Sequence, residues 1–108
     1  MEKIITGRCA SKGKVRGRIK LINKNHLKTG DVKNYIIVVE YLMPTMLHMI
    51  SSIKGVIAET GAVTSHPAIV CREFKVPFIV DVDCPFNIFK DESIVEMNAS
   101  EGIIKVLK

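Results

Sequence analysis

Residues 56–80, VIAETGAVTSHPAIVCREFKVPFIV, decide the fold of this chain. The stretch opens with a short apolar strand at 56–59 and then turns at Gly61, where glycine gives the backbone freedom. The pair His66-Pro67 predicts the start of a helix that ends near Phe74, because proline is favoured in a first helical turn. A second strand is expected at 76–80. The order strand, helix, strand indicates an α/β unit.

The flanking segments extend this unit into one α/β domain, residues 1–108, of packed β layers with helices on one face. The apolar run Tyr35–Glu40 predicts a central strand that is buried on both faces. Pro44 begins a predicted helix that reaches about Ile53, carries His48 on its polar side and is closed by Gly55. The remaining predictions are a polar loop or short helix at 22–34, a loop at 81–92, and strands at 3–9, 12–20, 94–97 and 103–107.

Composition favours a folded protein, since 47% of the residues are hydrophobic and 25% are charged. No run of apolar residues is long enough to span a bilayer, and the N-terminal segment has no signal-peptide pattern. Cys9, Cys71 and Cys84 show no metal-binding spacing. We therefore expect a cytoplasmic protein with reduced cysteines, with Cys9 and Cys71 buried, and with neither a metal site nor a membrane partner.

Positive charge is concentrated near the N-terminus, where residues 1–34 hold ten Lys/Arg and two Asp/Glu. Alternate positions of the strand predicted at 12–20 form a cation row, which comprises Lys12, Lys14, Arg16, Arg18 and Lys20. A period of two places these side chains on one side of a strand. The row is either a solvated strand face or a surface that attracts phosphate. Nucleic acid is disfavoured, because no aromatic residues alternate with the cations.

His66 is the candidate reactive residue, because it stands at the start of the predicted helix. Either His66 itself, Thr64 or Ser65 caps that helix, and a phosphate there would meet the free N–H groups and the positive end of the helix dipole. A neutral imidazole nitrogen is a competent nucleophile. Metal binding would need a second ligand three or four positions on, where Ile69 and Val70 stand. A purely structural helix-start histidine remains the competing interpretation of the spacing.

The segment 59–80 resembles the phosphohistidine motif of the phosphoenolpyruvate-utilising family, which includes phosphoenolpyruvate synthase and pyruvate phosphate dikinase. The matching motifs are Thr64-Ser65-His66, Ala68-Ile69-Val70, Arg72-Glu73 and Val76-Pro77. Residues 7–17 resemble the family's glycine-rich opening, and residues 91–95 and 102–104 resemble its closing hairpin. The resemblance implies a swivelling β/β/α phosphohistidine domain. Such a domain carries a phosphoryl group between an ATP-grasp-type nucleotide-binding domain and a phosphoenolpyruvate/pyruvate barrel domain, in the same chain or in separate ones.

The resemblance also implies roles for single residues. His66 is the phospho-acceptor, Thr64 and Ser65 support its ring and the phosphoryl oxygens, Gly61 shapes the turn, and Arg72 anchors the helix or docks a partner. ATP and magnesium belong to the partner domains, and this domain binds no cofactor of its own. The chain is then a component or fragment of a dikinase-type phosphotransferase that does not turn over alone. The alternative is a non-catalytic swivel domain used for regulation or partner binding.

The chain departs from the family pattern at four positions. Ala62 stands where a second glycine is frequent, and Pro67 where alanine is frequent. Lys75 and Asp81 both replace common glycines. None of these changes removes His66 or its hydroxyl neighbours, so the implied acceptor role is intact, although the substrate of such a branch is open.

Overall fold

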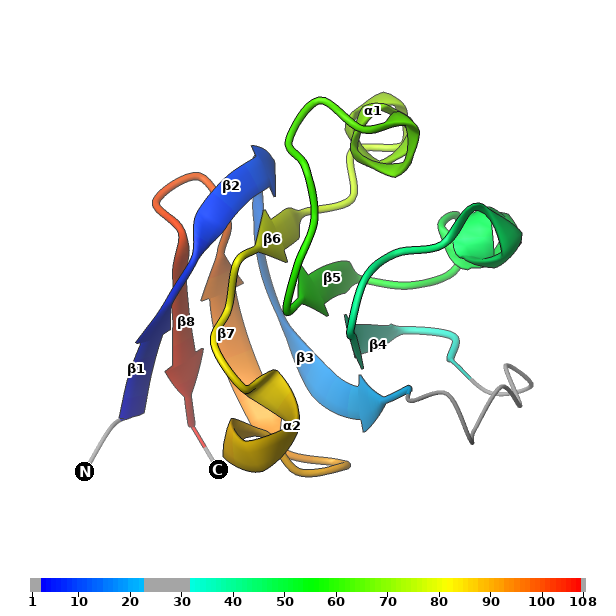
Figure 1. The fold of residues 1–108 in the computed structure, drawn as a ribbon. Coiled ribbons are helices and arrows are strands. Elements are labelled where there is room, and N and C mark those ends of the chain that lie inside the picture. The colour runs from blue at the N-terminus through cyan, green and yellow to red at the C-terminus, as the bar shows by residue number, and fades with distance from the viewer. Residues whose placement is uncertain (1–2, 23–31, 108) are drawn as a thin grey trace.

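The computed structural model describes residues 3–22 and 32–107 and has eight strands among them (Figure 1). Most of the loop expected at 22–34 lies outside the described residues. The elements, in chain order, are β1 (Lys3–Thr6), β2 (Arg8–Ser11), β3 (Lys14–Leu21), β4 (Tyr35–Val39), the 3₁₀ helix η1 (Pro44–Met49), β5 (Gly55–Ala58), α1 (His66–Glu73), β6 (Phe78–Val80), α2 (Pro85–Ile88), β7 (Ile94–Asn98) and β8 (Ile103–Val106). None of the helices in these ranges is long and apolar enough to cross a bilayer.

The strands form one sheet in the order β1-β8-β7-β3-β4-β5-β6-β2. Neighbours from β3 to β6 run parallel, and the other pairs run antiparallel. Strands β1 and β2 are separated only by Gly7 but lie at opposite edges of the sheet. The sheet must therefore curl until its two edges meet at this glycine, and Figure 1 shows the resulting bend.

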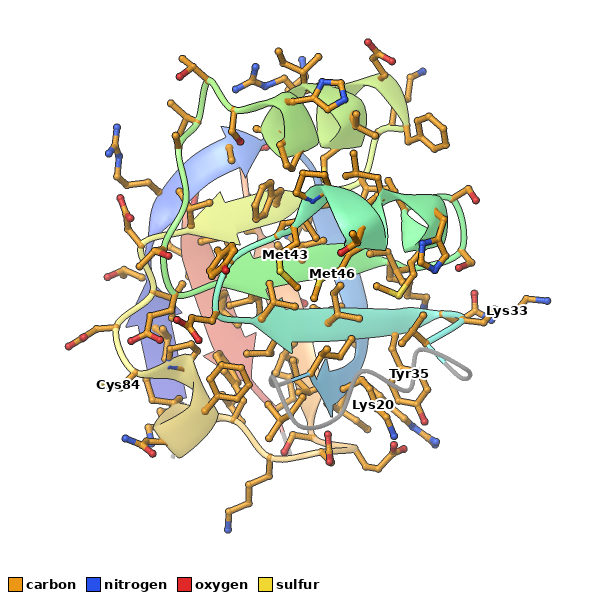
Figure 2. The ribbon with its side chains drawn as sticks, turned by 45° about the vertical axis from the view of Figure 1, so that its right-hand side comes forward. Lys20, Lys33, Tyr35, Met43, Met46 and Cys84 are labelled. Carbon is orange, nitrogen blue, oxygen red and sulfur yellow. The ribbon has the colours of Figure 1, made fainter. Side chains whose placement is uncertain are left out.

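Alternating side chains of the parallel strands supply two hydrophobic cores. In β4, Ile37 and Val39 belong to the core beneath η1 and α1, whereas Ile36 and Val38 belong to the core enclosed by the curled sheet. Met46 is buried in the first core and lies between η1 and the sheet (Figure 2). The result is two β layers and one helical layer, which confirms the predicted β/β/α class with α1 and η1 on one face.

Glycine contacts lock the place where the two sheet edges meet. The N–H of Gly7 donates to the carbonyl of Gly102, at 2.9 Å, in the turn between β7 and β8. Gly102 has a φ of +69°, and a Cβ atom there would overlap the Gly7 carbonyl. Only glycine meets both demands without strain.

The two ends of the described chain lie side by side, because Lys3 pairs with Val106 between β1 and β8. In Figure 1 these ends lie at the bottom of the molecule, and α1 lies at the top. The helix that carries His66 is thus at the end of the domain remote from both chain ends.

Several boundaries differ from the sequence-based expectations. The helix expected to reach Ile53 ends at Met49, because its N–H groups bond three residues back in a 3₁₀ pattern. Gly55 therefore begins β5 instead of closing that helix. His48 is exposed, as expected. The loop predicted at 81–92 contains the short helix α2, whose flanking Phe89 packs into the core of the curled sheet.

The prediction that Cys9 is buried is wrong. Cys9 is exposed, because it sits on the outer side of the edge strand β2, where its neighbour Ala10 turns inward. Cys71 is buried on the inner face of α1, as expected.

Candidate functional site

The site is built on the first turn of α1, which Ser65 caps. Ser65 has an extended backbone, with φ −70° and ψ 160°, and its hydroxyl accepts a hydrogen bond from the N–H of Ala68 at 3.3 Å. Its carbonyl accepts from the N–H of Ile69 at 3.1 Å. His66 is therefore the first helical residue and not the cap, and Pro67 is the second. Of the three caps that the sequence allowed, the structure uses Ser65.

The His66 side chain is exposed, and its ring has no hydrogen bond or ion pair within the part of the chain that the structure describes. The ring is thus open to a reaction partner. The helix mouth offers fewer backbone donors than the sequence suggested. Pro67 has no N–H, and Ser65 already satisfies those of Ala68 and Ile69. Within the first turn of α1, from His66 to Ile69, the N–H of His66 is the backbone donor left for a phosphoryl group, so side-chain hydroxyls have to add to it.

Thr64 and Ser65 carry those hydroxyls next to the ring. Thr64 is exposed and Ser65 half-buried, so at least the first is accessible to a bound group. Gly61 begins the loop that leads to them. A Cβ atom on Gly61 would lie 2.8 Å from the Cγ1 atom of Val80 in β6, so the loop passes too close to the sheet for a larger residue. Glycine is needed here for close approach.

Arg72 ties α1 to the rest of the site. Its Nε atom donates to the carbonyl of Ala10 in β2 at 2.8 Å, and its Nη2 atom donates to the carbonyl of Val63. One guanidinium thus holds the helix against the edge strand and fixes the loop three residues before His66. These contacts suit the anchoring role that the resemblance implied, while much of the side chain stays exposed.

The cation row is less positive than its sequence suggests. Arg16 pairs with Glu96 at 3.2 Å and Arg18 with Glu92 at 3.6 Å. Both carboxylates come from the segment of β7 and the loop before it, which lies beside β3. The ammonium of Lys20 lies 5.8 Å from the centre of the Tyr35 ring, on the side of the molecule seen at the lower right of Figure 2. Lys12 and Lys14 have no ion pair among the described residues.

Two of the three cysteine thiols, Cys71 and Cys84, have environments that suppress their reactivity. Burial raises the pKa of the Cys71 thiol from 9.0 to about 12. The neighbouring carboxylate of Asp83 raises the pKa of Cys84, by its charge and by accepting a hydrogen bond from the thiol. Within residues 3–22 and 32–107, no three His, Cys, Asp or Glu side chains gather in a way that could hold a metal ion.

Comparison with known proteins places the chain in a family. The model of the PEP-utilising enzyme mobile domain matches residues 31–102, which include the whole of α1 and the loop before it. The chain belongs to this family. Its function is accordingly that of a phosphohistidine carrier domain, as predicted from the motif around His66.

Relatives of this mobile domain are much longer proteins. The chain is 32% identical, over 95% of its length, to a rifampicin phosphotransferase from Bacillus cereus, and 30% identical, over 95%, to a probable phosphoenolpyruvate synthase from Methanothermobacter thermautotrophicus. It spans 12% and 15% of the lengths of these two proteins. The relatives therefore consist mostly of other domains.

A solved structure shows the same architecture. The N-terminal domain of Enzyme 1 – Nitrogen superposes on 72% of this chain with a TM-score of 0.62 and 22% identity, and the match covers 33% of that protein chain. At this identity the likeness concerns the fold alone. A shared fold does not by itself assign the chemistry, which has to be argued from the side chains of the site.

At two of the four positions where this mobile domain departs from its family pattern, the backbone conformation is one that favours the family's glycine. Lys75 has a φ of +58° and Asp81 a φ of +60°, both in the left-handed region that favours glycine. The backbone therefore keeps the conformation that a family glycine would adopt, at a cost in strain. Asp81 also pairs with Arg8 at 3.3 Å.

Proposed function

We propose that His66 accepts a phosphoryl group from a nucleotide held by an ATP-grasp-type domain and exchanges it with a phosphoenolpyruvate/pyruvate barrel domain. The observation that supports this most directly is the exposed imidazole at the first position of α1, which has no partner among the described residues, in a chain of the mobile-domain family. The chain provides the carrier. The nucleotide, its magnesium and the second substrate belong to the partner domains, so the chain does not turn over alone.

Each of the two transfer steps breaks one bond at phosphorus and forms another. A lone pair on an unprotonated nitrogen of His66 forms the N–P bond while the bond from phosphorus to the leaving oxygen of the nucleotide breaks, and that oxygen keeps the electron pair. In the second step an enolate oxygen of pyruvate attacks phosphorus, and the electron pair of the N–P bond returns to the ring. Positioning and neutralisation of charge provide most of the catalysis in such transfers.

The residues around the ring match these requirements. Ser65 fixes where the helix starts and so where His66 stands, and Arg72 fixes the preceding loop through the Val63 carbonyl. The donors adjacent in sequence to the His66 ring are the hydroxyls of Thr64 and Ser65 and the N–H of His66, and these would hydrogen-bond the phosphoryl oxygens. A mobile carrier needs little more, because each partner domain provides its own cations.

Phosphate labelling tests the proposal. The chain is incubated with its cognate nucleotide-binding partner and labelled ATP, and the product is examined for phosphate that is labile in acid and stable in base. We expect labelling that disappears in His66→Ala. His48→Ala is the matched control, because His48 is also exposed but its Nδ1 atom lies 2.9 Å from the carbonyl of Thr45. Label that survives in His66→Ala would place the acceptor elsewhere.

A further inference from the structure

An open hollow lies at the other end of α1 from His66, between the end of this helix, the turn after β2 and the turn after β7. It measures about 830 Å³, and its walls include Cys9, Ser11, Lys12, Arg72, Lys75 and Ser100. We refer to it as the basic hollow. Strand β2 and helix α1 contact each other here, and both lie at the top of Figure 1.

Each polar side chain in the walls of the basic hollow carries a hydrogen-bond donor or a positive charge, and among the described residues no Asp or Glu lines it. Lys12 and Lys75 have no ion pair among the described residues. Ser11, which is 2% exposed, adds a hydroxyl to the wall. The Ser100 hydroxyl accepts from the N–H of Gly13 at 3.1 Å, which leaves its own proton to donate. Such walls favour an anionic occupant.

The basic hollow lies on the same side of the domain as His66. Arg72, which forms part of its wall, also bonds the Val63 carbonyl in the loop that leads to the histidine. His66 and Glu73 bound α1, so the helix separates the two features by about 10 Å, at about 1.5 Å per residue. A protein domain seated over His66 would also cover the hollow.

We propose that the basic hollow receives an acidic segment, rich in Asp and Glu, of the protein domain that exchanges the phosphoryl group with His66. The inference rests on the proposed function, which requires such a partner. The wide opening and the flexible lysines suit a protein segment better than a single small anion. Arg16 and Arg18 do not belong to this docking surface, because Glu96 and Glu92 already neutralise them.

Cys9 gives a direct readout of the hollow. In a Cys84→Ser background it is the one exposed cysteine in the described part of the chain, since Cys71 is buried. Hexaglutamate serves as the probe, and alkylation of Cys9 by a neutral reagent is followed. We expect hexaglutamate to slow alkylation by about threefold or more at low salt. The protection should vanish at about 1 M salt, where the Debye length is ~3 Å.

Two double variants with the same change in charge locate the effect. Lys12→Glu with Lys75→Glu should abolish the protection, whereas Arg16→Glu with Arg18→Glu should leave it in place. Lys12→Gln with Lys75→Gln, which introduces no repulsion, should weaken it and serves if the glutamate pair does not fold. Equal loss in both glutamate pairs, no protection of the parent chain, or protection by inorganic phosphate as strong as by hexaglutamate would overturn the proposal.

The readout is independent of phosphoryl transfer. His66→Ala should keep full protection of Cys9 by hexaglutamate, because the imidazole does not line the hollow. A chain that is never labelled at His66 but shows the protection would contradict the proposed function and not the acidic preference of the hollow. A chain that is labelled but shows no protection would do the reverse.

Discussion

Replacing Arg72 by alanine should loosen the site around His66 and the fold together. The guanidinium of Arg72, on α1, donates hydrogen bonds to the carbonyl of Ala10 in β2 and to the carbonyl of Val63 in the loop before His66. Without it both carbonyls lose a charged donor. The loop and the helix start are then held mainly by the Ser65 cap.

The size of the effect follows from the surroundings of the two hydrogen bonds. A hydrogen bond to a charged group contributes about 1.5–3 kcal/mol when it is shielded from water. The bond to Ala10 is partly buried and the bond to Val63 is exposed, so water replaces part of each. We expect Arg72→Ala to lower the free energy of unfolding by about 2–3 kcal/mol. Arg72→Lys should lower it by about half as much, because a lysine ammonium cannot reach both carbonyls as the planar guanidinium does.

Urea unfolding of the chain measures this loss, with Glu73→Ala as the control. Glu73 is the exposed neighbour of Arg72 on α1, with no ion pair among the described residues, so its replacement should change stability by no more than about 0.5 kcal/mol. Labelling of His66 should also slow in Arg72→Ala, since the ring is less well positioned. If Arg72→Ala and Glu73→Ala were equally stable, the anchoring argument would be refuted.

Four further outcomes follow from single residues. Gly102→Ala should cost more than about 3 kcal/mol in urea unfolding, because its positive φ and the overlap with the Gly7 carbonyl act together, and a near-neutral result would contradict that packing. Ser65→Ala should cost about 1 kcal/mol through loss of the N-cap and should raise hydrogen exchange in the first turn of α1; unchanged exchange would argue against the cap. Lys75→Gly should raise the free energy of unfolding by about 0.5 kcal/mol, since relief of the left-handed strain exceeds the entropy cost of glycine, and a lower midpoint of thermal unfolding would count against it. The pKa of Cys71 is higher in the folded than in the unfolded chain, so its contribution to the free energy of unfolding should be intact below pH 9 and be lost as the pH rises toward 12, by up to about 1 kcal/mol per pH unit. Cys71→Ala should remove that part of the pH dependence. An identical dependence in the variant would show that the thiol is not shielded.

Local signals in the sequence predicted much of the fold. Gly61 lies in the loop before α1, Pro67 in the first turn of α1, and Pro77 just before the next strand, so each marks a boundary that the sequence predicted. The observed α1 begins at the predicted residue. The apolar run in β4 correctly indicated a strand buried on both faces. These features depend on neighbours in sequence, so periodicity and turn chemistry were sufficient to find them.

What the sequence did not reveal depends on contacts between distant segments. Arg16 lies opposite Glu96 because β3 and β7 pair in antiparallel register, and that register is set by the whole sheet. The feature of the sequence that could have indicated neutralisation of Arg16 and Arg18 was a pair of acidic residues four positions apart, Glu92 and Glu96. The reach of Arg72 to Ala10, across 62 positions of sequence, had no such signal. Cys9 was misjudged because its exposure depends on which side of an edge strand faces water.

The pairing of Lys3 with Val106, far from α1, has a mechanical consequence for the carrier. If both ends of the domain are attached at one place, a small rotation about that place moves the opposite end of the domain by a much larger distance. The lever is on the scale of the molecule's longest dimension, 36 Å. The curled sheet acts as a stiff arm, since a strand broken only at Gly7 joins its two edges. Under the proposed function, delivery of His66 from one partner to another would then require bending outside the domain and almost none within it.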